Sequence, residues 1–127
     1  MRRILIVAAI LIGGAQAASA DVRHSGFPKP ARGLWATSAK LCRGGDDGSP
    51  IRIGRSRIAT PALRCKVEYV VETAGERGAI FSAHGVCRSR ARPPARSILN
   101  LVVQPSGDSG AAIGTTLGDM KPYGRCP

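Results

Sequence analysis

The sequence predicts an all-β protein, a small antiparallel meander that disulfides staple into a β-barrel, with a two-sheet β-sandwich as the alternative. Three observations lead to this prediction. Short segments that alternate apolar and polar residues recur along the chain, Gly, Asp and Pro turns separate them, and no long segment has the 3.6-residue period of a helix. An open meander would expose strand edges to other chains, so closure into a barrel is favoured.

The first 20 of the 127 residues have the layout of a secretory signal peptide. Met1-Arg2-Arg3 supplies the positive start, Ile4–Ile12 the apolar stretch and Ala18-Ser19-Ala20 the small-residue cleavage site. The apolar stretch is shorter than the ~20 residues that span a bilayer, and no later segment reaches that length. We therefore expect a periplasmic or secreted protein with Asp21 as its mature N-terminus and without a transmembrane segment.

Residues 21–32 contain Gly26, Pro28 and Pro30 among few apolar side chains, which predicts a flexible lead-in. Residues 33–127 then form a single β domain, because the mature chain is too short for two domains. Gly33–Thr37 is its first strand candidate.

The elements between this first candidate and residue 60 are short and are bounded by turn residues. A single helical turn is expected over Ser38–Cys42, and the Gly- and Asp-rich run 44–50 predicts a loop. Ile51–Ile53 alternates apolar and charged residues. A turn at Gly54-Arg55 then leads to a strand over Arg57–Thr60.

The clearest strand is Leu63–Thr73, whose period of two predicts a half-buried antiparallel strand. Its alternation puts Cys65, Val67, Tyr69 and Val71 on one face and Lys66, Glu68, Val70 and Glu72 on the other. A Gly-containing turn leads to a return strand over Ala79–Arg88, with Phe81, Ala83, Gly85 and Cys87 on one face. The last three strands are expected at Ser97–Gln104, Ala111–Leu117 and Met120–Cys126.

Four cysteines, Cys42, Cys65, Cys87 and Cys126, lie in the mature chain. An even number in a short exported chain indicates two disulfides, and the absence of close Cys pairs argues against zinc. Three connectivities are open. The meander favours Cys42–Cys65, because Cys42 leaves the first strand at the end where Cys65 enters the fourth, and by exclusion Cys87–Cys126.

The chain is strongly basic, with 19 Lys and Arg against 8 acidic residues, and loss of Arg2 and Arg3 lowers the formal net charge from +11 to +9. A candidate anion-binding segment contains Arg88, Arg90, Arg92 and Arg96 around Pro93-Pro94. We expect these arginines to remain in water and to attract polyanions weakly and in a salt-sensitive way. The segment also fits a solvated hairpin loop. We do not expect nucleic acid as a partner, because the segment has no aromatic side chains for base stacking.

No assembled catalytic set is visible, so we predict no catalytic residue, no metal and no cofactor. His84 and Ser82 share one strand face, but no acid is placed to orient the imidazole. Asp46 and Asp47 supply too few oxygens for calcium. Trp35, the only tryptophan, is expected to plug one end of the core, with ligand stacking as the alternative.

Several short motifs together resemble a loose group of uncharacterised small exported four-cysteine bacterial β proteins with a Gly-x-Trp start. These motifs are Gly33-x-Trp35, Cys42, the Asp46-Asp47-Gly48 turn, Ile51-x-Ile53, Cys65, Cys87 and the final Tyr123-Gly124-Arg125-Cys126-Pro127. The Gly-x-Trp opening and meander are also similar, more distantly, to lipocalin-like barrels and to bacterial periplasmic inhibitors of metalloproteases. The resemblance implies a barrel scaffold, and no inhibitor's reactive segment carries over onto these residues.

These observations predict a non-enzymatic exported binding module. Its expected partner is another exported protein or an anionic component of the cell envelope. The alternative is a small hydrolase or lyase centred on His84, with Ser82 or an arginine assisting.

Overall fold

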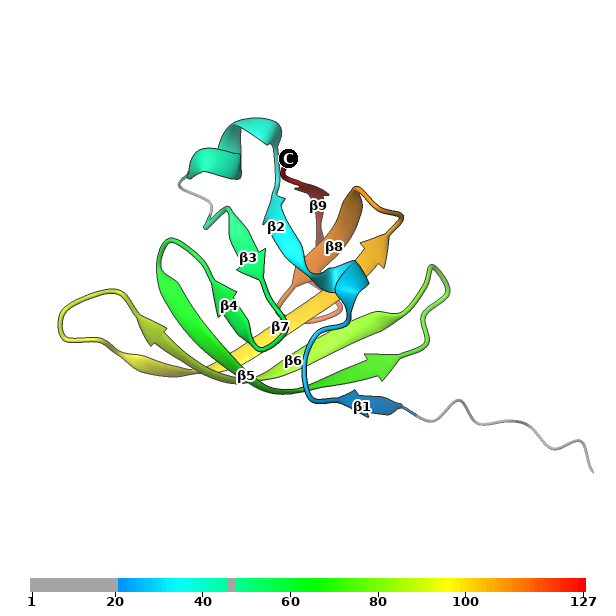
Figure 1. Cartoon of the computed structure of the whole chain (residues 1–127), viewed down its shortest axis with the longest axis horizontal. Coiled ribbons are helices and arrows are strands. Elements are labelled where there is room, and N and C mark those ends of the chain that lie inside the picture. The colour runs from blue at the N-terminus through cyan, green and yellow to red at the C-terminus, as the bar shows by residue number, and fades with distance from the viewer. Residues whose placement is uncertain (1–20, 46–47) are drawn as a thin grey trace, which may run out of the picture.

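The protein is described by a computed structural model that covers residues 21–45 and 48–127, so the predicted signal peptide and Asp46-Asp47 lie outside the described residues. This part of the chain consists of strands and two short 3₁₀ helices (Figure 1). The elements are β1 (Val22–His24), η1 (Lys29–Ala31), β2 (Gly33–Ala36), η2 (Ala39–Arg43), β3 (Ile51–Ile53), β4 (Arg57–Ala59), β5 (Leu63–Thr73), β6 (Ile80–Ser89), β7 (Arg96–Ser106), β8 (Gly110–Gly114) and β9 (Lys121–Arg125).

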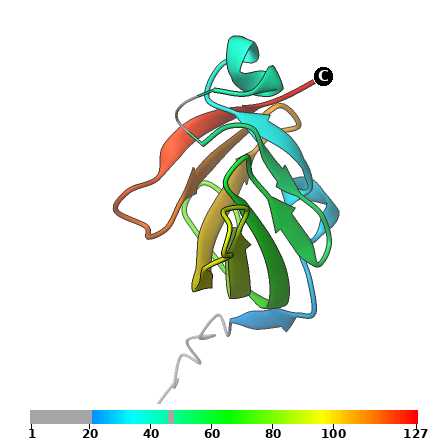
Figure 2. The ribbon, with the colours of Figure 1, turned by 90° about the vertical axis from the view of Figure 1, so that its left-hand side faces the viewer.

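The strands β2 to β9 form a closed antiparallel barrel (Figures 1 and 2). Each strand pairs with the next along the chain, and β2 pairs with β9 to close the circle. Short turns between consecutive antiparallel strands need no crossover, so the local sequence signals are enough to specify the order. The predicted disulfide-stapled barrel is confirmed, and a two-sheet sandwich does not describe this topology.

The strand β5 departs from the predicted alternation because of a β-bulge. Val67 pairs with Gly85 whereas Tyr69 pairs with His84, so Glu68 is an extra residue on β5. The bulge reverses the alternation beyond it. Cys65 and Val67 are buried as expected, but Val70, placed on the outer face by the sequence, is buried.

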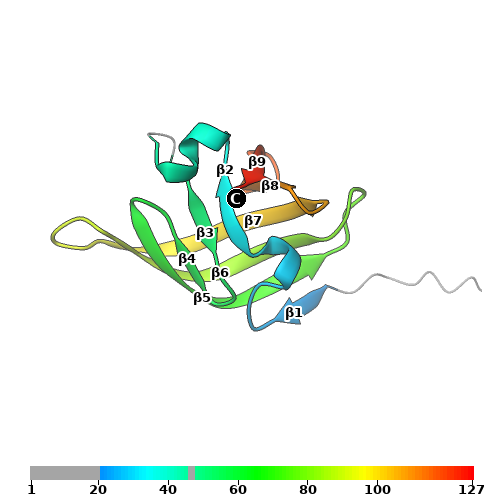
Figure 3. The same cartoon turned by 45° about the horizontal axis from the view of Figure 1, so that its top comes forward.

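The segment 21–32 does not form the loose lead-in that its composition predicts. The strand β1 pairs with β5 through Val22–His24, and Figures 1 and 3 show it beside that strand. Phe27 and Ala31 are completely buried in the core, and the Phe27 amide donates a hydrogen bond to the Arg55 carbonyl at 2.8 Å. Burial of one large aromatic side chain therefore attaches a Gly- and Pro-rich segment to the barrel.

The barrel interior is occupied by buried apolar side chains from β2 to β8, and the partly buried Tyr123 of β9 packs against them. Trp35 has no exposed surface, and its indole N–H donates to the Ala31 carbonyl at 3.1 Å. The Arg125 guanidinium lies over the indole ring, 4.3 Å from its centroid. Gly33 has a φ of 143°, and a Cβ there would meet the Arg125 guanidinium, so this position requires glycine. Trp35 is thus a core residue, which agrees with its predicted role as a plug of the core and not with ligand stacking.

The disulfides are Cys42–Cys126 and Cys65–Cys87, so the predicted pairing is wrong. Cys65 and Cys87 are direct cross-strand partners on β5 and β6, with Cα atoms 4.0 Å apart. Cys42 follows β2 and Cys126 follows β9, and these two strands pair with each other. Closure of the barrel brings the two ends of the domain together. The prediction followed the strand ends along an open meander and so did not include the pairing of β2 with β9.

Candidate functional site

The outer wall of the barrel carries a groove of about 750 Å³ over the strands β3 to β7. Its cationic side chains are those of Arg52, Arg57, Arg64, Lys66, Arg88 and Arg96, and we refer to it as the basic groove. All six are exposed. The side chains face outward because their strand neighbours, such as Ile53, Ile58 and Cys65, point into the core and successive residues of a strand alternate.

The strand register arranges these residues in two rows across the sheet. In the first row, Arg64 of β5 is the direct partner of Arg88 of β6, and Arg88 is the partner of Arg96 of β7. Ala59 of β4 continues the row on the other side of Arg64, followed by Arg52 of β3. Neighbouring strands lie about 4.8 Å apart, so three consecutive strands present arginines side by side.

The second row lies two residues away, about 7 Å along the strands. Arg57 of β4 is the partner of Lys66 of β5, Lys66 is the partner of Val86 of β6, and Val86 is the partner of Ile98 of β7. Ile98 is 79 % exposed. The second row therefore begins with two cations and ends with two apolar side chains.

The cations of the basic groove have no counter-charge close enough for an ion pair. Glu68, at the bulge, is the one acidic residue in its lining. Within the described part of the chain, none of the six cationic side chains makes a hydrogen bond or an ion pair, and the one ion pair found there joins His24 and Glu72. Like charges directly opposite each other destabilise a sheet, so this wall carries an electrostatic cost that an anionic ligand would remove.

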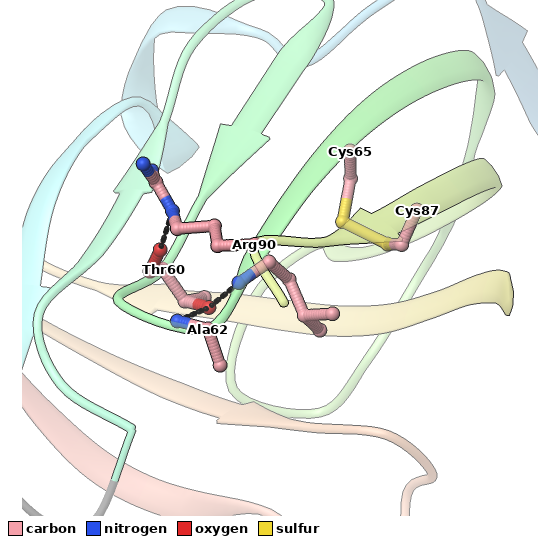
Figure 4. Close-up of a disulfide and its surroundings, with 6 residues drawn as sticks. Thr60, Ala62, Cys65, Cys87 and Arg90 are labelled. Atoms are coloured by element: carbon pink, nitrogen blue, oxygen red, sulfur yellow. Dashed lines mark hydrogen bonds between the residues drawn. A yellow bond between two sulfur atoms is a disulfide. The ribbon is translucent and has the colours of Figure 1, made fainter. Parts of the chain in front are cut away.

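The structure separates the four arginines of the predicted anion-binding segment. Arg88 and Arg96 lie in the basic groove, whereas Arg90 and Arg92 lie in the exposed β6–β7 turn. Figure 4 shows Arg90 beside the β4–β5 turn, where its Nε donates to the Thr60 carbonyl at 3.1 Å and its amide to the Ala62 carbonyl at 3.0 Å. Arg90 therefore holds the hairpin against its neighbour in addition to carrying charge.

Sequence reasoning missed the other cations of the basic groove, namely Arg52, Arg57, Arg64 and Lys66. They belong to three strands and form no charged cluster along the chain. One signal was available: each alternates with an apolar residue and so had to lie on the outer face. Their alignment with Arg88 and Arg96 depends on the register of pairing.

The surroundings of His84 differ from those of a catalytic histidine. Its ring stacks on that of Tyr69, with centroids 4.7 Å apart, and the Arg23 guanidinium lies 3.8 Å from the centre of the tyrosine ring. The structure places Ser82 on the same face of β6, but among the described residues it records no hydrogen bond from Ser82 to His84 and no ion pair between His84 and a carboxylate.

In residues 21–45 and 48–127 no three His, Cys, Asp or Glu side chains are grouped to hold a metal ion. None of the helices in this part of the chain has the length and apolar character needed to cross a membrane. The two disulfides fit an extracellular or periplasmic location. No protein-family model, curated protein or solved structure matches the chain.

Proposed function

We propose that this protein is an exported, non-enzymatic binding protein that takes an anionic ligand in the basic groove. The observation that carries the proposal is the register of β4 to β7, which places cationic side chains opposite one another with no counter-charge beside them. A fold tolerates such an arrangement when a bound anion stabilises it.

The position of the Cys65–Cys87 disulfide supports this proposal. The bridge joins β5 and β6 one residue away from the repelling pair Arg64 and Arg88, on the opposite face of the sheet. The covalent link holds the two strands together under repulsion and so keeps the cations in position before a ligand arrives. Because the two strands are already fixed, binding of an anion has to order side chains but not the backbone, which lowers its entropic cost.

Export supports an anionic component of the cell envelope as the ligand class. The signal-peptide pattern of residues 1–20 and the two disulfides both point to an oxidising compartment. Nucleic acid is scarce in such a compartment. The groove lining also contains no aromatic residue for stacking on single-stranded bases.

The alternative of a hydrolase or lyase centred on His84 receives less support. General acid–base catalysis needs a histidine that an acceptor orients toward the reacting group. The His84 imidazole instead packs face to face with Tyr69. Ser82, its proposed helper, makes no hydrogen bond to it within the described residues.

A triple substitution, Arg64→Gln, Arg88→Gln and Arg96→Gln, tests the proposal with heparin as a soluble polyanionic probe. The matched control Arg43→Gln, Arg77→Gln and Lys121→Gln removes the same charge from exposed sites outside the groove. We expect the groove variant to lose at least tenfold in heparin affinity at low salt and the control less than threefold. Equal losses in both variants would show that net charge alone attracts the probe and would overturn the site.

A further inference from the structure

We infer that the natural ligand of the basic groove is the surface of an anionic lipid bilayer, approached with the β6–β7 hairpin in front. This inference rests on the proposed function, since it names the class of anion that the groove binds. It adds a role for apolar side chains that a groove for a soluble polyanion would not need.

The composition of the hairpin suits a membrane surface. Every residue from Ala91 to Ile98 is exposed. Between its arginines the turn presents the small apolar side chains of Ala91, Pro93, Pro94 and Ala95. A segment that combines exposed arginines with apolar side chains suits the boundary between lipid headgroups and acyl chains.

The position of Ile98 also favours a bilayer over a soluble polyanion. It is the most exposed of the large hydrophobic side chains in the described chain, and it lies beside Val86 at the end of the row that contains Arg57 and Lys66. A soluble polyanion would leave this isoleucine in water. On a bilayer, the Ile98 side chain would lie among the acyl chains while the cations of the same wall contact phosphate groups.

Charge is distributed unevenly along the barrel. Turns of a meander alternate between its two ends, so the β5–β6 and β7–β8 turns lie opposite the β6–β7 hairpin, as Figure 1 shows. Three acidic residues, Glu72, Glu76 and Asp108, belong to that opposite end. Arg23, Arg77 and Lys29 lie at the same end and offset these acids, whereas the hairpin end carries an excess of cations. A negatively charged surface would therefore attract the hairpin end more strongly than the other, which orients the molecule.

Vesicle sedimentation with the full exported chain, both disulfides intact, tests the inference. Vesicles of phosphatidylglycerol and phosphatidylcholine in equal amounts are compared with phosphatidylcholine alone and with soluble heparin. We expect binding to the anionic vesicles, none to the neutral ones, and at least tenfold weaker vesicle binding for the triple variant at Arg64, Arg88 and Arg96.

Ile98→Ser separates a bilayer from a soluble polyanion. Leu117→Ser is the matched control, because Leu117 is 68 % exposed and lies in the β8–β9 turn, away from the strands β4 to β7 that carry the cations and Ile98. We expect Ile98→Ser to weaken vesicle binding about fivefold and to leave heparin binding unchanged, whereas Leu117→Ser changes neither. In Ile98→Trp, the indole fluorescence should shift to the blue with anionic vesicles, and in Leu117→Trp it should not.

The possible failures are distinguishable. Heparin binding that depends on the groove, without binding to anionic vesicles, would overturn the bilayer and keep the proposed function. Equal vesicle binding by the two serine variants, or no blue shift in Ile98→Trp, would also overturn insertion of the hairpin. If the triple variant bound both heparin and the anionic vesicles as tightly as the unmodified protein, that result would overturn both the groove and the bilayer.

Discussion

Arginines have opposite surroundings in two regions of the barrel, the β2–β9 seam and the wall formed by β4 to β7. At the seam, Arg125 lies over Trp35, and its guanidinium donates hydrogen bonds to the backbone carbonyls of Pro30, Arg32 and Asp108. On the wall, Arg64, Arg88 and Arg96 face one another without such partners in the described residues.

The difference teaches how to distinguish a structural arginine from one available to a ligand. When the N–H groups of an arginine donate hydrogen bonds to backbone carbonyls, the arginine stabilises the fold. Its substitution then leaves those carbonyls without a donor. The wall arginines keep their donors free and repel each other. The seam should therefore govern stability and the wall should govern binding, and each of the following changes tests part of that division.

Removal of the seam disulfide should have the largest effect. Cys42–Cys126 spans a sequence separation of 84 residues, against 22 for Cys65–Cys87. The chain-entropy relation gives losses of about 4.5 and about 3.4 kcal/mol for the paired alanine substitutions. Guanidinium unfolding of the Cys42→Ala, Cys126→Ala variant and of its counterpart at Cys65 and Cys87 measures both. A larger loss at Cys65–Cys87 would show that the wall, not the seam, limits stability.

Substitution of Arg125 should come next. Arg125→Gln removes the contact with Trp35 and the bonds to three carbonyls, which should lower the free energy of unfolding by about 2 kcal/mol. Arg125→Lys keeps the charge but loses the planar fork and should recover less than half of that loss. Urea unfolding followed through Trp35 fluorescence gives the values. Full stability of Arg125→Lys would mean that charge alone matters at the seam.

The triple glutamine variant of the wall should change the free energy of unfolding only slightly, and should raise it where Arg125→Gln lowers it. Relief of repulsion between Arg64, Arg88 and Arg96 should raise the free energy of unfolding by up to ~1 kcal/mol in the triple glutamine variant at low salt. Salt screens the same repulsion, so the gain should shrink in 1 M NaCl. A loss of stability comparable with that of Arg125→Gln would contradict the division between seam and wall.

The smallest effect should come from acidification of the β8–β9 turn. Asp119 accepts hydrogen bonds from the Thr115 hydroxyl and from the Thr115 and Thr116 amides, which lower the pKa of this carboxyl below its ordinary value of 3.8. A lowered folded-state pKa stabilises the turn above the unfolded value, and that contribution is lost as the pH falls through the folded value.

Amide exchange measures this local effect. Protection of the Thr115 and Thr116 amides should fall as the pH drops below 4, beyond the intrinsic pH dependence of exchange, while protection in β5 and β6 stays constant. Asp119→Ala should show the low protection at every pH. Retained protection of the two threonine amides in Asp119→Ala would disprove the role of the carboxylate.

The sequence predicted most strands and turns because their signals are local. The expected strand Leu63–Thr73 has the observed bounds, and each strand expected after Gly33 is present within a few residues. The β5 bulge was missed because the alternation of Val67, Tyr69 and Val71 reads as uninterrupted, and only pairing with Gly85 and His84 reveals the extra residue. The packing of Phe27 was missed because a lone aromatic among Gly and Pro carries no periodic signal.

The candidate site could be predicted only in part. Arg88, Arg90, Arg92 and Arg96 attract notice because they are close in the chain, and the hairpin indeed keeps Arg88 and Arg96 together. Arg57 and Lys66 are nine residues apart and become neighbours through the register of β4 with β5. The same distinction explains the wrong disulfide prediction, because the seam joins residues from the two ends of the domain.

The amino-acid sequence by itself determined that the chain forms an all-β meander, where the strands and turns after Gly33 lie, and that four cysteines and an excess of cations accompany it. These are properties of short segments, set by side-chain alternation and turn chemistry. Only the tertiary structure decided which cysteines pair, that Phe27 and Trp35 share one core, and that six cations line one groove. Strand register and barrel closure create these neighbours, and both depend on packing between residues far apart in the chain.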